Sequence, residues 1–196
     1  MPVTAFKEKR SFYERDALDW YVEPAWCTEL LLKRVSFELV WDPACGCGTI
    51  VRTCRNCNIN AIGTDIIKRG DLTLYAANNP ELDFLRNAAI DNIMWTDIIT
   101  NPPYKLAETF VYRGIALRAR KIAVLVRLDF LASQKRHQLF SEYPPTLVLV
   151  LSRRPSMPPG EKLGKIKASG GQHDFCWIVW DFDHIAEPYT QLDWIL

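Results

Sequence analysis

Hydrophobic residues of this chain fall mainly into short runs that are rich in valine, isoleucine and leucine and are bounded by glycine, proline or charged residues. Runs of this length and composition predict β-strands rather than helices. The stretch 122–128 is almost continuously apolar, which is typical of a strand at the centre of a sheet that is covered on both faces. The predicted strands cover residues 37–41, 60–65, 97–100, 122–128, 146–152 and 175–180.

Between these runs the apolar residues return with a helical period, most clearly over 105–120. Further helices are predicted at 28–34, 49–54 and 129–140, and residues 1–36 are expected to form a helical N-terminal region. Strands that alternate with helices predict a parallel sheet with helices on both faces and ligands at its carboxyl edge. The spacing of 146–152 and 175–180 instead suggests an antiparallel hairpin, so the fold class is α/β with an antiparallel last strand.

Length and composition narrow the class of protein. A chain of 196 residues with 48% hydrophobic and 24% charged residues predicts one globular domain and argues against disorder or a coiled coil. The sequence predicts a soluble, intracellular (cytoplasmic) protein without a membrane partner. The net charge is +1, so any basic surface must arise from local segregation of charge.

The run 37–41 leads into Asp42-Pro43-Ala44-Cys45-Gly46-Cys47-Gly48, after which the chain turns helical. A strand, a glycine turn and a helix place backbone N–H groups around a ligand. Asp42 puts negative charge beside this loop, which would repel a phosphate and attract an ammonium or sulfonium group. Asp65 ends the next strand, where a carboxylate can bind a ribose diol; a helix cap or a solvated turn is the alternative.

The sequence Asn101-Pro102-Pro103-Tyr104 follows the predicted strand 97–100. Proline fixes the backbone here in an extended form, leaving the Asn101 side-chain oxygen and the Pro102 carbonyl as neutral acceptors near an aromatic ring. This arrangement suits a flat substrate with an amino group conjugated to a π-system. A simple turn at the end of a strand would use the same residue types.

Four of the six cysteines, Cys45, Cys47, Cys54 and Cys57, lie close together in the sequence. A structural zinc site usually has two well-separated pairs of ligands. Two of these cysteines belong to the glycine loop and two to the predicted helix after it, so no metal site is predicted.

Several of these motifs resemble those of one enzyme family. Asn101-Pro102-Pro103-Tyr104 resembles the Asn-Pro-Pro-Tyr motif of amino-methyltransferases that use S-adenosylmethionine, and the loop 42–48 resembles their Asp-Pro-x-x-Gly-x-Gly. The segment 83–85 resembles their Asp-Phe-Leu, and 127–131 with 135–136 is similar to small phage and prophage members. The resemblance implies a Rossmann-like class I methyltransferase fold, formed by residues 1–196 as a single domain.

The resemblance also implies roles for individual residues. Asn101, Pro102 and Tyr104 are the expected catalytic residues. The family places a hydroxyl residue before the proline near the methionine part of the cofactor, whereas this chain has Glu23 there. Asp83 would accept a hydrogen bond from the adenine amino group of the cofactor, and Phe84 would line the ring pocket. The expected cofactor-binding set is Tyr21, Pro24, Trp26, Asp42, Pro43, Cys45, Gly46, Gly48, Asp65, Asp83, Phe84 and Asn101.

The connection 153–174 of the C-terminal hairpin is basic, with five basic residues against one acid over 153–173. Such a loop suits a polyanion backbone, although its charge does not distinguish DNA from RNA. The resemblance implies DNA as the partner and methylation of the exocyclic N6 amine of adenine as the reaction. Met157 replaces the aromatic residue that often borders the target base in the family. The residues expected to bind nucleic acid are Arg153, Arg154, Lys162, Lys165 and Lys167.

Alternatives remain open from the sequence. The same motif serves relatives that methylate adenine in RNA or a glutamine amide in a protein, and a nucleic-acid-binding module with a vestigial cofactor fold is the reading without catalysis. Little more than 182–196 follows the hairpin, so no separate target-recognition domain is predicted. Recognition of the target would then be short, or would depend on a homodimer or a partner protein.

Overall fold

The computed structural model describes residues 19–74, 81–86, 97–165, 171–183 and 189–196. Its centre is a seven-stranded sheet with the order β2-β1-β3-β4-β6-β5-β7. All strands except β6 run in the same direction, because β6 pairs antiparallel with both β4 and β5 while the other neighbours are parallel. The strands are β1 Leu39–Asp42, β2 Asn60–Gly63, β3 Asp97–Thr100, β4 Lys121–Arg127, β5 Leu147–Leu151, β6 Phe175–Asp181 and β7 Gln191–Ile195.

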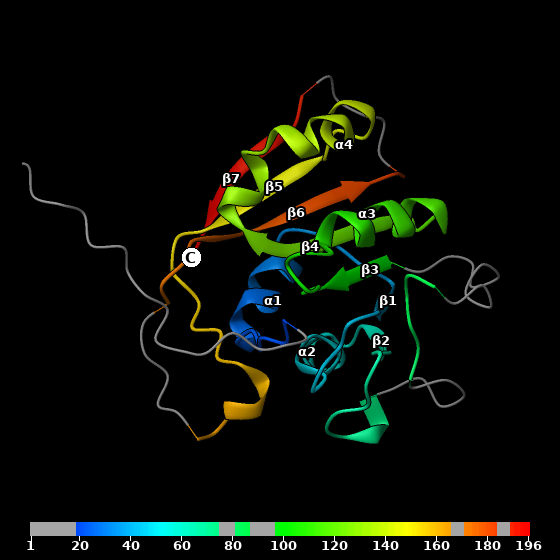
Figure 1. Cartoon of the computed structure of the whole chain (residues 1–196), viewed down its shortest axis with the longest axis vertical. Coiled ribbons are helices and arrows are strands. Elements are labelled where there is room, and N and C mark those ends of the chain that lie inside the picture. Colours follow the sequence, from blue (N-terminus) through cyan, green and yellow to red (C-terminus); the bar gives the residue numbers. More distant parts are fainter. Residues whose placement is uncertain (1–18, 75–80, 87–96, 166–170, 184–188) are drawn as a thin grey trace, which may run out of the picture.

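Helices cover both faces of this sheet (Figure 1). They are α1 Ala25–Leu32, α2 Thr49–Asn56, α3 Ala107–Ala116 and α4 His137–Glu142, with 3-10 turns at Leu72–Leu74, Leu128–Leu131, Gln134–Arg136 and Gly160–Lys162. A mostly parallel sheet with helices on both faces is the Rossmann-like fold, so the predicted fold class is confirmed.

Strand β4 shows how the alternation of side chains builds two cores. Ala123 and Leu125 pack with residues of α1 and α2, whereas Ile122, Val124 and Val126 pack with residues of α3 and α4. Successive side chains of a strand point to opposite faces, so a fully apolar strand supplies both layers. The strand is central because each of its faces removes apolar surface from water.

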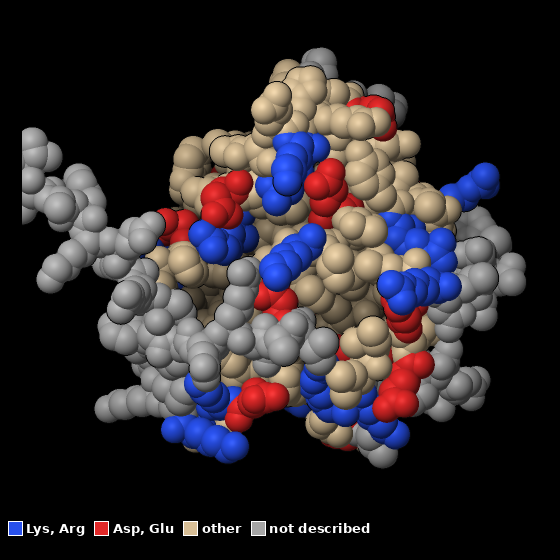
Figure 2. All heavy atoms as spheres, in the orientation of Figure 1, with Lys and Arg blue, Asp and Glu red and all other residues tan. Residues whose placement is uncertain are grey.

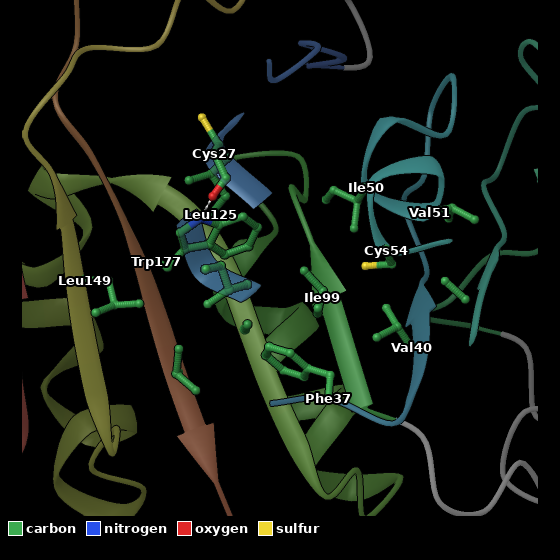
Figure 3. Packing of buried hydrophobic residues seen from close by; sticks show 14 of the residues in the cluster. Cys27, Phe37, Val40, Ile50, Val51, Cys54, Ile99, Leu125, Leu149 and Trp177 are labelled. Atoms are coloured by element: carbon green, nitrogen blue, oxygen red, sulfur yellow. Dashed lines mark hydrogen bonds between the residues drawn. The ribbon is translucent and has the colours of Figure 1, made fainter. Parts of the chain in front are cut away.

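Figure 3 shows the core on the side of α1 and α2, where Trp177 of β6 lies beside Leu125. The Trp177 ring is fully buried, and its Nε1 donates a hydrogen bond of 2.8 Å to the Cys27 carbonyl oxygen at the start of α1. A buried indole N–H needs such an acceptor. This bond therefore ties the N-terminal helix to the antiparallel strand.

Two elements differ from the sequence prediction. The predicted helix 129–140 is wrong as a continuous helix, because the chain leaves helical geometry at Ala132 (φ −105°, ψ 73°) and Ser133 (φ −147°, ψ 124°). Only two 3-10 turns and the short α4 remain of it. The strand β7 was not predicted. It follows the antiparallel strand β6 in the chain and pairs parallel with β5 at the edge of the sheet.

The other boundaries shift by a few residues. The helix predicted at 105–120 spans Ala107–Ala116, and the helix predicted at 28–34 begins earlier, directly after Pro24. Pro24 is extended (φ −72°, ψ 144°), as expected for a proline that precedes a helix. Within the described residues, no helix has the length and apolar character needed to cross a membrane. Of the predicted helical region 1–36, residues 1–18 lie outside the described residues, and α1 is the helix described in the rest.

Candidate functional site

The glycine loop between β1 and α2 has the backbone geometry that its sequence predicts. Gly46 (φ +53°) and Gly48 (φ +80°) both adopt left-handed conformations, which glycine reaches without strain. The Cys45 amide donates to the Thr64 carbonyl oxygen at 3.0 Å, and the Thr64 amide donates to the Asp42 carbonyl oxygen at 2.9 Å. These bonds hold the loop against the end of β2.

A cavity of about 350 Å³ lies at the carboxyl ends of β1, β2 and β3. This is the edge where a Rossmann-like sheet binds its ligands, and the volume suits a small molecule. Eight residues of the predicted cofactor-binding set line it: Tyr21, Pro43, Cys45, Gly46, Asp65, Asp83, Phe84 and Asn101. The sequence motifs around residues 45, 65, 84 and 101 therefore meet in one place.

Asp65 lies in the cavity wall with both carboxylate oxygens already bonded. Its Oδ2 accepts a hydrogen bond of 2.8 Å from the Gly46 amide, and its Oδ1 accepts from the Ile67 amide and from Arg69 Nη1. The ion pair with Arg69 measures 2.8 Å and is largely buried. The carboxylate thus joins the glycine loop to the end of β2, and its predicted contact with a ribose stays a prediction.

Asp42 lies elsewhere than expected. Its side chain is 1% exposed, and it does not line the cavity. Its Oδ1 accepts a hydrogen bond of 3.2 Å from the Ala44 amide. Burial, followed by the nearby negative charge of Glu23, raises the pKa of Asp42 well above its usual value. The expectation of an exposed negative charge beside the glycine loop is therefore wrong. The Asp42 carboxyl is buried and accepts a hydrogen bond from the backbone of the loop.

Asn101 follows β3 and lines the cavity. Its Nδ2 donates to the Tyr21 carbonyl oxygen at 3.0 Å and to Glu23 Oε2 at 2.8 Å. Its Oδ1 has no hydrogen-bond partner in the described part of the chain, although this atom is buried. Buried acceptors are nearly always paired in folded proteins, so a partnerless amide oxygen beside a cavity indicates a place for a donor from a ligand.

Tyr104 is not part of the cavity lining. Its ring stacks on Tyr21 with a centroid distance of 5.7 Å and an interplanar angle of 13°, and it also contacts Phe175. Its hydroxyl donates to the Met157 sulfur at 3.4 Å. One face of the ring is thus covered by Tyr21, which itself lines the cavity. The predicted stacking of Tyr104 on a substrate base stays a prediction, as does the acceptor role of the buried Pro102.

Phe84 and Asp83 form part of the wall of the cavity. Phe84 is 2% exposed, and its ring packs against Trp41 at 5.2 Å and Phe110 at 4.9 Å. Asp83 accepts a hydrogen bond of 3.0 Å from the Leu85 amide. Both residues line the cavity, and Phe84 also belongs to the core on the side of α3. Their roles towards the adenine ring of the cofactor stay predictions.

The segment 20–22 lines the cavity and pairs with the segment 158–160. The Gly160 amide donates to the Trp20 carbonyl oxygen at 3.0 Å, and the Val22 amide donates to the Pro158 carbonyl oxygen at 3.1 Å. The Trp20 ring fits between two glycines: an added Cβ would lie 2.5 Å from it at Gly46 and 2.2 Å from it at Gly160. Three segments far apart in sequence therefore meet at Trp20, which is one of the cavity-lining residues.

Four residues of the predicted cofactor-binding set do not line the cavity: Pro24, Trp26, Asp42 and Gly48. Sequence analysis also missed lining residues, above all Trp20, Glu23 and Arg69. For two of these residues the sequence holds a signal. Glu23 replaces the family's hydroxyl residue, and Arg69 follows Asp65 by four residues.

The predicted nucleic-acid-binding residues lie on the segment that follows β5. Arg153 lies over the Trp26 ring at 5.1 Å, and Arg154 forms an exposed ion pair of 2.7 Å with Asp174. Lys162 lies in a 3-10 turn and Lys165 is exposed, while Lys167 is outside the described residues. On the face shown in Figure 2, basic and acidic side chains are interspersed. A role in binding nucleic acid stays a prediction.

The cysteines near the loop occupy different environments. Cys45 and Cys54 are buried, Cys47 is half-buried and Cys57 is exposed. Among the described residues, no group of three or more His, Cys, Asp or Glu side chains could hold a metal ion.

Comparison with known proteins does not identify a family for this chain. No known family profile matches the chain, and no curated protein sequence does. Among solved structures, a human methyltransferase 10 domain containing protein is similar, with a TM-score of 0.42 and 14% identity, covering 80% of this chain and 79% of its own. A similarity of this level assigns no activity to the chain.

Proposed function

We propose that this chain transfers a methyl group from S-adenosylmethionine to the exocyclic N6 amine of adenine in DNA. The observation that carries the proposal is the Asn101 amide, whose nitrogen is bound by two acceptors while its oxygen lacks a donor in the described chain. An amine N–H is the kind of donor that a buried neutral oxygen needs. The motif resemblance and the cavity at the carboxyl edge support the same assignment.

The residues of the cavity fit the cofactor. Asp65 offers a carboxylate for the ribose, Phe84 an apolar wall for the adenine ring and Asp83 an acceptor for its amino group. Glu23 and Asp65 line the same cavity, and carboxylates favour a cationic sulfonium over an anionic ligand. When bound, the cofactor supplies an activated methyl group on a positively charged sulfur.

The chain's own contribution would be to bind and orient the amine. Asn101 Oδ1 would accept one amino hydrogen and the Pro102 carbonyl oxygen the other, which draws the nitrogen lone pair out of conjugation and towards the methyl group. The amine nitrogen would take the methyl group that the bound cofactor supplies, the sulfur would leave as a neutral thioether, and the proton released from the nitrogen would pass to water. Holding the two reactants in line supplies much of the acceleration.

The choice of DNA is the finer part of the proposal. The basic residues Arg153, Arg154, Lys162, Lys165 and Lys167 favour a polyanion over a glutamine-containing peptide. RNA carries the same backbone charge, so methylation of adenine in RNA is the second candidate. We also propose that a second copy of the chain or a partner protein extends target recognition.

The test is to incubate the protein with labelled cofactor and matched DNA, RNA and glutamine-peptide substrates, and to identify the modified atom by mass spectrometry. Methyl transfer to adenine N6 in DNA is the expected result. Transfer only to RNA or to the peptide would replace the substrate assignment. The cofactor is also titrated into the protein by calorimetry. If no binding were detected, the enzymatic function would be refuted and a vestigial module that binds nucleic acid would be favoured.

Asn101→Ala provides the matched variant. It should abolish turnover and leave cofactor affinity within about twofold, because the lost acceptor contacts the substrate amine rather than the cofactor. Asp65→Ala should do the reverse and weaken cofactor binding first. If Asn101→Ala lost cofactor binding as completely as Asp65→Ala, the proposed division of roles would be wrong.

A further inference from the structure

Glu23 is a buried acid that the motif resemblance does not account for. Its side chain is 7% exposed and lines the same cavity as Asn101, and its Oε2 lies 2.8 Å from Asn101 Nδ2. The bond joins two segments 78 residues apart, just before α1 and just after β3. A buried carboxylate is costly unless its hydrogen bonds compensate, and this one is bonded to a neutral amide rather than to a cation.

We propose that Glu23 is a positioning residue for the methyl transfer: it fixes the Asn101 amide so that the amide oxygen is left for the substrate amine, and its carboxylate strengthens that oxygen as an acceptor. This inference rests on the proposed function and adds a residue and a pH dependence to it.

Orientation is the first part of the argument. The amide nitrogen has two donors, and one is used by the Tyr21 carbonyl oxygen and the other by Glu23. A rotation of the amide by 180° would place Oδ1 against a carbonyl oxygen and a carboxylate, which are both acceptors. Glu23 and Tyr21 together therefore exclude the orientation in which Asn101 would offer a donor to the substrate.

Polarisation is the second part. A hydrogen bond to a charged acceptor is stronger than one to a neutral acceptor, and bonds in a chain polarise one another in a medium of low dielectric constant. When the carboxylate accepts from the amide nitrogen, amide resonance moves negative charge onto Oδ1. The oxygen then attracts the substrate amino hydrogen more strongly than an isolated asparagine would.

The surroundings of Glu23 bring its pKa close to neutral pH. Burial raises its pKa to about 7, and the hydrogen bond from Asn101 opposes that rise. The neighbouring acids respond to its charge: the pKa values of Asp42, Cys27 and Tyr104 are all raised, chiefly by burial and next by Glu23. Arg153 is the cation that acts on Cys27 from the segment after β5.

The first test uses the protein without any cofactor or substrate. The side-chain ¹⁵N signal of Asn101, assigned by its loss in Asn101→Ala, is followed by NMR from pH 5.5 to 8.5. In the wild type it should shift with a midpoint near 7, and in Glu23→Gln the shift should vanish while the signal remains. Glu29→Gln, an exposed change on α1, is the matched control and should titrate like the wild type.

A wild-type Asn101 signal that does not move over this range would overturn the inference, as would an unchanged titration in Glu23→Gln. Asp42→Asn separates the second buried acid, since the titration should persist there. Loss of the titration in Asp42→Asn but not in Glu23→Gln would assign the effect to Asp42 instead.

The second test is kinetic. In the wild type, kcat should rise between pH 6 and 8 as Glu23 ionises, and in Glu23→Gln this rise should be absent. Glu23→Gln should also lower kcat by about tenfold to a hundredfold and keep the KM for cofactor within about twofold. Equal losses of kcat and cofactor affinity, with the pH profile unchanged, would show that Glu23 is only structural. Absence of methyl transfer in the wild type would refute the proposed function but leave the NMR result standing, so the two failures are distinguishable.

Discussion

Replacing Glu23 by glutamine should make the folded protein less sensitive to pH. The pKa of Glu23 is raised by burial from 4.5 to about 7, so the folded state holds a proton that the unfolded state releases. A raised acid pKa gives stability that is fully present below pH 4.5 and is lost as the pH rises through 7. The full difference corresponds to roughly 3 kcal/mol of unfolding free energy, most of it lost between pH 5 and 8.

Glutamine has nearly the same shape and keeps an acceptor for Asn101, but it has no proton to lose. The unfolding free energy of Glu23→Gln relative to the wild type should therefore rise by about 2 to 3 kcal/mol between pH 5 and 8. Urea denaturation at fixed ionic strength measures it at each pH. Glu29→Gln, on the exposed side of α1, corrects for the general effect of removing one negative charge.

A difference between Glu23→Gln and the wild type that stays constant over this pH range would refute the reasoning. It would mean that the Glu23 carboxylate is solvated in solution, and with it the tight contact to Asn101 would be in doubt.

Gly48→Ala should destabilise the protein by more than Gly164→Ala, because both residues have a left-handed backbone but only at Gly48 would a Cβ meet a side chain, at 2.5 Å from Leu74 Cδ1. Backbone strain alone is about 1 kcal/mol, so an unfolding free energy reduced equally in both variants would exclude the clash. Leu125→Ala, in the fully buried centre of β4, should cost about 2 to 5 kcal/mol, whereas Leu192→Ala on the exposed edge strand should change stability by less than about 0.5 kcal/mol. Similar midpoints of chemical denaturation for these two leucine variants would contradict the assignment of the core.

The sheet could be predicted largely because its strands carry local signals. The stretch 122–128 is apolar throughout and became the central strand β4, and the two prolines after Thr100 mark the end of β3. β7 carries no such signal, since Leu192 and Trp194 are exposed and only its pairing with β5 makes it a strand. Where pairing with a distant segment decides the structure, local pattern is a weak guide.

The candidate site was predictable to the same extent. The glycine loop, Asp65 and Asn101 follow strands directly, so the parallel order of β2, β1 and β3 was enough to bring them together. The orientation of Asn101 was not predictable, because its partners Tyr21 and Glu23 lie about 80 residues earlier in the chain. The burial of Asp42 also depends on packing that its own sequence neighbours do not reveal.

The contact at Trp20 has a consequence for exchange with solvent. The amide protons of Val22 and Gly160 are held by a reciprocal pair of bonds between the same two segments, outside the main sheet. Both should therefore show a common protection factor against exchange with deuterium, lower than that of the amide of Leu125 in β4. A small molecule that binds in the cavity should slow both amides together, which makes them paired reporters of how often this pairing beside the cavity opens.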